Sequence, residues 1–242
     1  MTTPVIVTGA SAGIGAAIAR HLSRAGHDLV LTYRTRKEPT LDLVAEIERA
    51  GGQAVVVQAD VTVRADVRAV FDIAERTFGP AYALVSNAGV SKVRTIADTD
   101  DHLIQELLGV NLLGALYGMQ EAATRLAEGG AIVNISSTAV QTATPGLGVY
   151  LAAKSGVETL TRVAAKEFGN RKIRVNAIAP GLIDSPMFRD GKTEADLERF
   201  TALAPLHRLG SNAEIAAAVA YLLHPGASWV NGQVLRVNGG VA

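Results

Sequence analysis

Residues Val5 to Gly15 read Val-Ile-Val-Thr-Gly-Ala-Ser-Ala-Gly-Ile-Gly, a short apolar run that passes directly into a glycine-rich turn. Three consecutive β-branched residues are typical of a buried strand. After the turn, Ile14, Ile18 and Leu22 recur at the spacing of one helix face. The stretch therefore predicts a strand, a tight turn and a helix. Glycines in such a turn let the backbone approach a pyrophosphate, and the N-terminus of the following helix favours anions.

The glycine spacing is Gly-x-x-x-Gly-x-Gly, whereas the common dinucleotide turn reads Gly-x-Gly-x-x-Gly. An ordinary βα turn in which Ser11 caps the helix is the alternative interpretation. The position of the turn directly after the first strand favours nucleotide binding. We therefore expect cofactor contacts from Gly9, Ser11, Ala12, Gly13, Ile14 and Gly15.

Short apolar runs alternate with helical patterns along the chain. The runs occupy residues 4–8, 28–33, 54–58, 81–86, 131–135, 173–178 and 233–237. Helical periodicity predicts helices at 13–26, around 43–47, and at 63–78, 99–110, 112–127, 149–168 and 214–223. Strands that are apolar throughout and alternate with helices are typical of a parallel sheet covered on both faces. Right-handed crossovers make this a doubly wound α/β sheet of the Rossmann type, in a single domain spanning residues 1–242.

Residues 182–211 break this rhythm, because Pro186, Pro205 and a short charged helix interrupt it. We interpret the segment as a lid over the site. Its side chains include many large apolar groups, namely Leu182, Ile183, Met187, Phe188, Phe200, Leu203 and Leu206. Such a lining suits an apolar ketone better than a sugar, although the same residues could simply pack the lid onto the sheet.

The composition excludes several classes of function. Lys and Arg number 23, as do Asp and Glu, so no basic surface for nucleic acid or membrane is expected. The chain has no cysteine, and its five histidines lack the spacing of metal ligands, so no metal site is expected. No apolar run reaches the roughly 18 to 20 residues of a membrane span, and Met-Thr-Thr-Pro at the start does not resemble a signal peptide. A cytoplasmic location is expected.

Tyr150 and Lys154 stand four residues apart in the helix predicted at 149–168. That spacing places both side chains on one helix face. A free tyrosine has a pKa of about 10, and a cation one turn away should lower it toward neutral pH. The pair is therefore a candidate general acid and base. A chance pairing on a solvated helix face is the alternative.

The turn after the second strand reads Tyr33-Arg34-Thr35-Arg36, with no acidic residue before Glu38. An acidic residue here would bind the 2′-hydroxyl of NAD, whereas arginine accommodates the 2′-phosphate of NADP. We therefore expect Arg34 and Thr35 to select NADP(H), with a solvated charged turn as the alternative.

Polar and small residues follow the later strands. Asp60 and Val61 come after the third strand, and Asn87, Ala88 and Gly89 after the fourth; both sets are expected beside the cofactor. Ser136 and Ser137 follow the fifth strand, and Pro180 and Gly181 the sixth. Asn111 separates two predicted helices, where asparagine usually marks a cap or a kink. The carboxyl ends of parallel strands meet at one edge, so these residues are expected to converge.

Taken together, these motifs resemble those of the classical short-chain dehydrogenase/reductase family along essentially the whole chain. The resemblance implies strand order 3-2-1-4-5-6-7 and a catalytic set of Asn111, Ser137, Tyr150 and Lys154. Ser137 is chosen over Ser136 because the family serine lies thirteen residues before the tyrosine. Lys154 would also bind the nicotinamide ribose, and Asn111 would hold a water. Pro180, Gly181, Ile183 and Ser185 would hold the nicotinamide.

Within the family the chain is most similar to 3-oxoacyl-(acyl carrier protein) reductases, which implies a ketone or 3-oxoacyl thioester substrate. The basic residues expected near the cleft are Arg171, Lys172 and Arg174, but Glu128 opposes docking of an acidic carrier protein. The alternatives are a general ketone or sugar dehydrogenase using NAD(H), an extended-family epimerase or dehydratase, and a non-catalytic NADP-sensing regulator. The resemblance also implies a homotetramer in which helices 112–127 and 149–168 pair with a second subunit.

Overall fold

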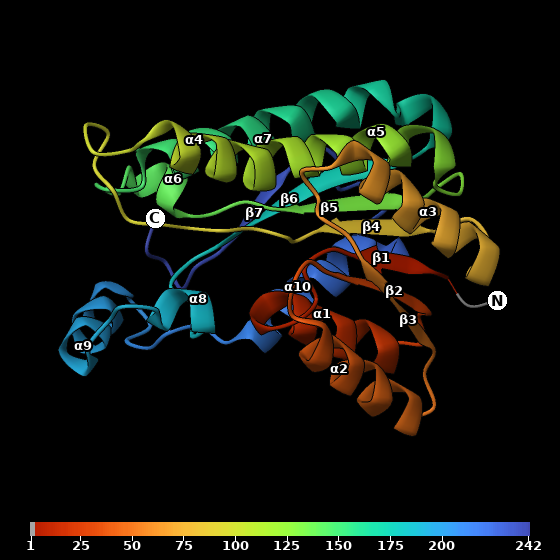
Figure 1. The fold of residues 1–242 in the computed structure, drawn as a ribbon, viewed down its shortest axis with the longest axis horizontal. Coiled ribbons are helices and arrows are strands. Elements are labelled where there is room, and N and C mark those ends of the chain that lie inside the picture. Colours follow the sequence, from red (N-terminus) through yellow and green to blue (C-terminus); the bar gives the residue numbers. More distant parts are fainter. Residues whose placement is uncertain (1–2) are drawn as a thin grey trace.

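A parallel sheet of seven strands forms the centre of residues 3–242, the part of the chain that the computed structural model describes. Its strand order is β3-β2-β1-β4-β5-β6-β7, and helices cover both faces (Figure 1). The predicted doubly wound fold and its strand order are therefore confirmed. Met1 and Thr2, on which part of the signal-peptide expectation rests, lie outside the described residues.

The strands match the predicted apolar runs to within two residues at each end. They are β1 (Val5–Val7), β2 (Leu29–Tyr33), β3 (Ala54–Gln58), β4 (Ala83–Ser86), β5 (Ala131–Ile135), β6 (Arg174–Pro180) and β7 (Val234–Val237). Every residue of β1, β2, β4, β5 and β6 is buried. The edge strands β3 and β7 are only partly buried. Helices on both faces leave no wet side for the inner strands, which explains their unbroken apolar sequence.

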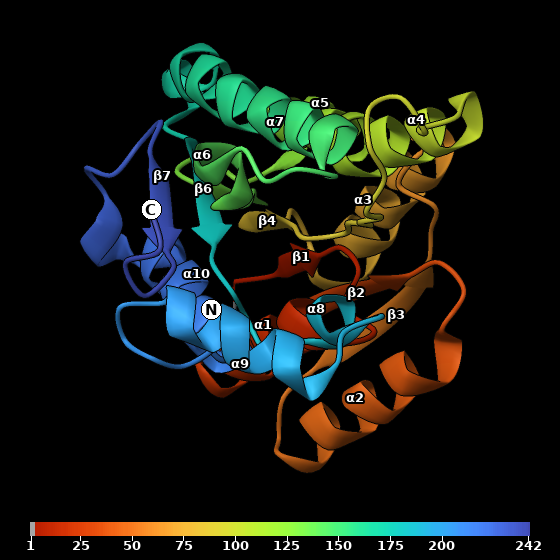
Figure 2. The same ribbon diagram turned by 90° about the vertical axis from the view of Figure 1, so that its left-hand side faces the viewer.

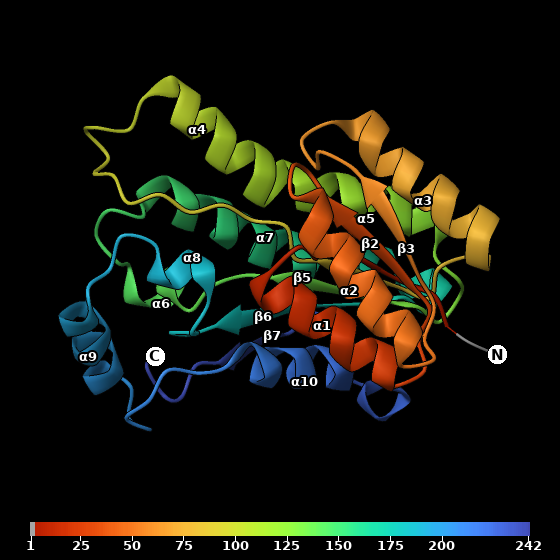
Figure 3. The same ribbon diagram turned by 60° about the horizontal axis from the view of Figure 1, so that its bottom comes forward.

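The helices form two layers. One face is covered by α1 (Gly13–Arg24), α2 (Lys37–Arg49) and α10 (Asn212–Leu223), and the other by α3 (Arg64–Phe78), α4 (Asp101–Leu108), α5 (Gly114–Arg125) and α7 (Gly148–Glu167) (Figure 1). Three short helices, α6 (Ala139–Thr142), α8 (Pro186–Arg189) and α9 (Glu194–Leu203), lie at the end of the sheet that Figure 2 brings forward. Figure 3 shows α1 lying between α2 and α10.

Two predictions about helices were wrong in detail. The helices expected at 99–110 and 112–127 form one continuous run, in which the π-helix Gly109–Leu113 joins α4 to α5. Asn111 lies inside that π-helix, and its side-chain amide donates a hydrogen bond to the carbonyl of Leu107 at 2.9 Å. A side chain that bonds this carbonyl competes with the regular helix ladder, so the helix widens instead of breaking. The lid contains two helices, α8 and α9, instead of one.

Only part of the basic surface expected from Arg171, Lys172 and Arg174 forms. Arg174 is buried, and Arg171 donates hydrogen bonds to the carbonyls of Ala123 and Leu126 at the end of α5. Lys172 is exposed, but its ammonium lies 2.7 Å from Glu128. Free carbonyls at helix ends need partners, and nearby arginines satisfy them from within the fold.

Arg174 and Tyr82 cap the last carbonyls of α10. The guanidinium donates to Leu222 O at 2.6 Å and to Leu223 O at 3.4 Å, and the Tyr82 hydroxyl donates to Leu223 O at 3.0 Å. We expect Arg174→Met to lower the free energy of unfolding by about 2–3 kcal/mol, because hydrogen bonds from charged donors are lost. Tyr82→Phe should cost about 1 kcal/mol. Urea denaturation of both variants checks this, and wild-type stability of Arg174→Met would contradict it.

Candidate functional site

The loops that follow β1, β4, β5 and β6 meet at the carboxyl edge of the sheet, the side that faces the viewer in Figure 2. The strand order reverses between β1 and β4, because β2 and β3 lie on one side and β5 to β7 on the other. Ligands of open α/β sheets bind in the crevice at this reversal. The predicted site residues follow these strands, so the topology gathers them at one edge.

Hydrogen bonds join the glycine-rich turn to the loop after β4. Thr8 Oγ1 accepts from the backbone N–H groups of Asn87 and Ala88, both at 3.0 Å. In return, Asn87 Nδ2 donates to Thr8 O at 2.9 Å and to Gly9 O at 3.0 Å. Thr32 of β2 also holds the turn, because its Oγ1 accepts a hydrogen bond from Gly9 N at 3.2 Å. Sequence reasoning did not give Thr8 or Thr32 a role, although a threonine beside the first glycine of the turn was a visible signal.

The turn has the shape of an anion cradle. Gly9 has φ +67° and Gly13 has φ +56°, conformations that favour glycine. A Cβ on Gly9 would lie 2.8 Å from Ala88 Cα, and one on Gly15 would lie 2.5 Å from Asn87 Nδ2. Ala12 is the N-cap of α1, and no side chain caps the helix, so the alternative role for Ser11 as a cap is wrong. First-turn N–H groups without a side-chain cap fit a phosphate ligand.

Residues at the ends of β2 and β3 form the adjoining part of the site. Arg34 and Thr35 are exposed, and the Arg34 guanidinium lies 4.0 Å from Asp60 Oδ2. Asp60 Oδ1 accepts from both the backbone N–H and the hydroxyl of Thr62, at 2.9 and 2.7 Å. Val61 is buried beside them. The carboxylate of Asp60 is thus fixed in place, while the guanidinium of Arg34 keeps donors for a further anion.

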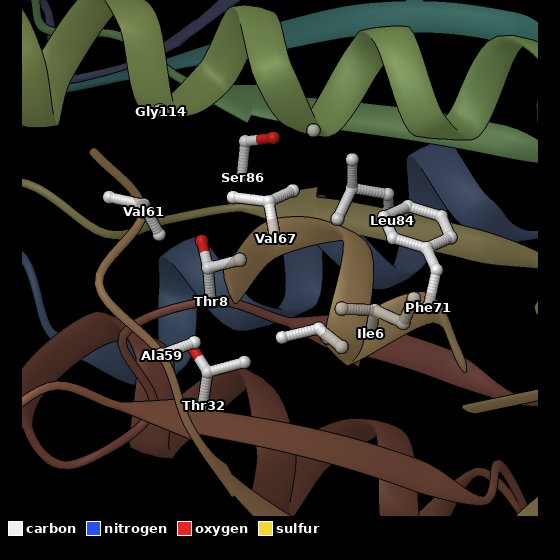
Figure 4. A pocket seen from close by; sticks show the side chains of 12 residues that line it. Ile6, Thr8, Thr32, Ala59, Val61, Val67, Phe71, Leu84, Ser86 and Gly114 are labelled. Atoms are coloured by element: carbon white, nitrogen blue, oxygen red, sulfur yellow. The ribbon is translucent and has the colours of Figure 1, made fainter. Parts of the chain in front are cut away.

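A small cavity of about 10 Å³ lies between the sheet and helices α3 and α5 (Figure 4). Thr8, Thr32 and Ser86 contribute hydroxyl groups to its lining, and Ser86 Oγ has no protein hydrogen-bond partner. Such a volume holds about one water molecule. Because Thr8 lines it from the glycine-rich turn, the cavity belongs to the support of that turn and is too small for a substrate.

Ser137, Tyr150 and Lys154 come together where β5 ends and α7 begins. Lys154 is buried, and its Nζ donates to Ile135 O at 2.8 Å and lies 5.8 Å from the centre of the Tyr150 ring. Ser137 is half-buried and close enough to Tyr150 to influence its pKa. Ser136 instead is buried and bonds Glu158, which supports the choice of Ser137 as the serine of the site.

Asn111 joins this group through the loop after β4. Its side-chain Oδ1 accepts from Val90 N at 3.2 Å and its Nδ2 donates to Val90 O at 2.9 Å. Gly89 lies between Asn111 and Lys154, since a Cβ on Gly89 would be 3.0 Å from Asn111 Oδ1 and 3.7 Å from Lys154 Nζ. The side-chain amide of Asn111 is thus engaged with backbone groups, and its expected hold on a water stays a prediction.

The pKa of Tyr150 moves against the expected direction. Burial raises the pKa of the phenol, and the hydroxyl of Ser137 opposes this only in part. Burial also lowers the pKa of Lys154 from 10.5 to about 8. The expected lowering by Lys154 is not seen, because burial disfavours the charged form of both groups. Tyr150 is therefore held protonated near neutral pH.

The segment after β6 returns to the glycine-rich turn. Gly181 follows Pro180, and a Cβ on it would lie 2.6 Å from Asn238 Cα. Ile183 is buried and forms a bridge with Gly210 at the base of the lid. Ser185 caps α8 by accepting from Phe188 N at 3.2 Å, and its Cβ would lie 3.9 Å from a Cβ on Gly13. The start of the lid thus lies beside the candidate phosphate cradle.

The lid leaves several apolar side chains exposed, among them Met187, Leu203 and Leu206. Leu182, Ile183 and Leu206 also line a cavity of about 50 Å³ between the lid and the end of β7. Within residues 3–242, no cluster of three metal-ligating side chains occurs. No helix in this same range has the length and apolar character needed to span a membrane.

The chain is similar in sequence and in fold to several known proteins. A family profile described as "Enoyl-(Acyl carrier protein) reductase" matches residues 9–242. The NADPH-dependent aldehyde reductase-like protein, chloroplastic, of Arabidopsis thaliana is 40% identical over 250 residues, covering 97% of this chain and 92% of the relative. A 3-oxoacyl-[acyl-carrier-protein] reductase of Staphylococcus aureus is 35% identical over 243 residues, covering 100% and 98%. A metagenomic blue fluorescent protein in complex with NADPH superimposes with TM-score 0.94 at 33% identity, covering 99% and 98%.

The fold and these matches define a nicotinamide-dependent oxidoreductase. The chain belongs to the short-chain dehydrogenase/reductase family, as the sequence motifs predicted. Three solved relatives contain NADP or NADPH. The uncapped glycine cradle and the exposed guanidinium of Arg34, which lies 4.0 Å from Asp60, fit the phosphate groups of such a cofactor.

Lys154 is expected to lower the stability of the ligand-free protein, because its ammonium is buried in the candidate site. Its pKa of about 8 in the folded protein lies below the ordinary 10.5, so the unfolded chain binds more protons between these values. Wild-type stability should therefore rise as the pH increases from about 8 to about 10.5. At pH 7 Lys154→Met should stabilise the ligand-free protein by up to about 3 kcal/mol, and the gain should shrink across that range.

Urea denaturation at several pH values measures this effect. Lys172→Met is the matched control, because Lys172 is exposed and replacing it removes no buried charge. A Lys154→Met protein that is less stable than wild type at pH 7 would contradict the expectation.

Proposed function

We propose that the protein reduces a ketone or 3-oxoacyl group to a secondary alcohol with NADPH. The observation that carries this proposal is the meeting of Tyr150, Ser137 and Lys154 at the carboxyl edge of the sheet. The phenol is protonated at neutral pH, as a proton donor for a developing alkoxide must be, although burial raises its pKa in the ligand-free protein and so makes it a weaker acid there. In this proposal Ser137 donates a hydrogen bond to the same substrate oxygen and so orients the carbonyl. NADPH, when bound, supplies the hydride.

The residues proposed to hold the cofactor come from each strand end. The pyrophosphate would lie on the turn from Gly9 to Gly15, the 2′-phosphate on Arg34 and Thr35, and the adenine beside Asp60 and Val61. The nicotinamide half would contact Asn87, Ala88, Gly89, Tyr150, Lys154, Pro180, Gly181, Ile183 and Ser185. Binding of a ribose hydroxyl by Lys154 would give the buried ammonium a second partner besides Ile135 O.

For the substrate we propose a small apolar ketone, an aldehyde or a free 3-oxoacyl thioester. The exposed apolar side chains of the lid support an apolar substrate. The carrier-borne substrate has less support, because Arg174 is buried, Lys172 is paired with Glu128, and the half-buried Arg171 is held on helix carbonyls. The names of the relatives, an aldehyde reductase and a 3-oxoacyl reductase, agree with carbonyl reduction. A role in fatty acid biosynthesis and a cytoplasmic location remain predictions.

A panel of carbonyl substrates, followed through NADPH absorbance, tests the proposed function. It should contain free ketones, aldehydes, 3-oxoacyl thioesters and the same acyl group on an acyl carrier protein. We expect turnover of the free compounds and only a modest gain from the carrier. A hundredfold gain in kcat/KM from the carrier, about 2.7 kcal/mol, would indicate a dedicated fatty-acid enzyme. Binding of NADPH without turnover of any carbonyl would favour the non-catalytic regulator.

Tyr150→Phe should lower kcat by about 10²–10⁴-fold while leaving the NADPH dissociation constant nearly unchanged. The variant removes the proton donor but keeps the ring. Tyr221→Phe, at an exposed position on α10, is the matched control and should behave as wild type. Steady-state kinetics and fluorescence titration measure both quantities. Retention of more than about a tenth of wild-type turnover would show that Tyr150 is not the donor.

Arg34→Asp should weaken NADPH much more than NADH, because a like charge replaces the proposed partner of the 2′-phosphate. The ratio of kcat/KM for the two cofactors measures this. The control Arg94→Asp changes an arginine whose NH1 donates to the adjacent backbone carbonyl of Val93, in the loop after β4. If the ratio for Arg34→Asp equals that of wild type, the turn is only a solvated surface.

We also propose a homotetramer built on α5 and α7, two helices in contact on one face of the sheet. Val163 on α7 and Leu113, the last residue of the π-helix before α5, stay exposed, and large apolar groups left in water favour burial against another surface. Analytical ultracentrifugation is expected to show a tetramer at micromolar concentration. A stable monomer at that concentration would contradict the proposal.

A further inference from the structure

Helix α7 presents a stripe of polar side chains to the buried end of β5. Tyr150, Lys154, Glu158 and Thr161 follow one another at intervals of four, four and three residues, which places them on one helix face. Lys154, Glu158 and Thr161 are exposed by only 4%, 7% and 0%. Tyr150 and Lys154 have roles in the proposed reaction. Glu158 has none, although a buried carboxyl group is costly unless it serves a purpose.

Three hydrogen bonds connect this stripe to three consecutive residues of the chain at the end of β5. Thr161 Oγ1 accepts from Asn134 Nδ2 at 2.9 Å, and Lys154 Nζ donates to Ile135 O at 2.8 Å. Glu158 Oε1 accepts from the hydroxyl of Ser136 at 2.8 Å. These three bonds, called the β5–α7 seam below, fix where the helix lies along the strand.

The seam matters because the covalent connection cannot fix the distance between Ser137 and Tyr150. Thr138 is buried, but residues 139–149 are all partly or fully exposed and include one short helix, and Ala143 and Gly146 among them have φ +47° and +81°. Ser137 and Tyr150 must nevertheless act on one substrate oxygen. A misplacement of about 1 Å in such a pair can cost about a hundredfold in rate.

Glu158 is the member of the seam nearest the reacting groups that is free of other duties. Lys154 is expected to bind the ribose as well, so replacing it would also disturb the proposed cofactor site. Thr161 lies nearly one turn further along α7 than Glu158. The bond from Ser136 to Glu158 involves the residue directly before Ser137, so a single peptide unit connects it to the serine of the site.

We propose that Glu158 is a positioning residue, whose carboxyl group holds Ser136 and thereby places the Ser137 hydroxyl against Tyr150. The kinetic part of this inference rests on the proposed function. An apolar residue would fill the same position without a buried polar group, so the carboxyl group serves geometry at a cost in stability.

Four single variants, and the double variant Glu158→Ala/Ser136→Ala, test the proposal by kinetics. Glu158→Ala and Ser136→Ala each remove the bond, Glu158→Gln keeps an acceptor oxygen, and Glu167→Ala removes an exposed glutamate of the same helix. Glu158→Ala and Ser136→Ala should each lower kcat about tenfold or more while the NADPH dissociation constant stays within about twofold. Glu158→Gln should recover most of the loss, and Glu167→Ala should match wild type. The double variant should lose no more than the worse single one, because both act through one bond.

A second measurement needs no substrate. Tyrosinate absorbance is titrated against pH in each variant, and the curve of the same variant carrying Tyr150→Phe is subtracted to isolate Tyr150. The Ser137 hydroxyl opposes the effect of burial on the pKa of Tyr150. Ser137→Ala should therefore raise the midpoint, and Glu158→Ala should raise it in the same direction. Lys154 lies 5.8 Å from the ring, but with a pKa of about 8 it is neutral where Tyr150 titrates, and it is present in every variant.

The kinetic experiment and the titration together distinguish the possible outcomes. A Glu158→Ala protein with wild-type kcat and an unchanged Tyr150 midpoint overturns the proposal, as does one that changes only thermal stability. If wild type reduces no carbonyl, the proposed function fails, and the titration alone decides the role of Glu158. If Glu158→Ala does not fold, Ser136→Ala and Glu158→Gln supply the same comparison: the former must raise the midpoint and the latter must not.

Discussion

The hydrogen bonds between Thr8 and Asn87 hold the site together at the place where the strand order reverses. One hydroxyl accepts from two backbone N–H groups, and one side-chain amide donates to two carbonyls. These bonds join the loops after β1 and β4 directly, although Thr8 and Asn87 are 79 positions apart in the sequence. The glycine cradle depends on this joint, since Gly9 and Gly15 pack directly on Asn87 and Ala88. The hydrogen bonds that support the candidate cofactor cradle are thus the same ones that join the two loops where the strand order reverses.

The second half of the site depends on the burial of charge. Lys154 occupies a place where its own charged form is disfavoured, and a backbone carbonyl is its partner there. The same burial keeps Tyr150 protonated. A site that stores unfavourable electrostatics in the free protein is consistent with a ligand that relieves it on binding. The β5–α7 seam joins these groups across the loop between Ser137 and Tyr150, which is partly exposed beyond the buried Thr138.

The lid connects the two halves. Its first residues lie beside the glycine cradle, since Ser185 and Pro186 approach the space above Gly13. Its base is closed by backbone bonds, from Asp184 N to Gly210 O at 2.8 Å and from Gly210 N to Leu182 O at 2.9 Å. The apolar side chains of the lid thus project from a fixed base. A ligand in the cradle would therefore lie next to the lid that carries these apolar side chains.

The sequence alone determined the architecture, the strand order through family resemblance, and the set of residues that the fold gathers at one edge. Apolar runs and helical spacing are local patterns, and parallel strands must bring their carboxyl ends together. Only the tertiary structure decided that Arg174 is buried, that Asn111 widens a helix, and that burial raises the pKa of Tyr150. Burial, hydrogen-bond partners and the direction of an ammonium depend on residues far apart in the chain. The link from Ser136 to Glu158 is of this kind, because no local pattern predicts which strand residue a helix side chain will meet.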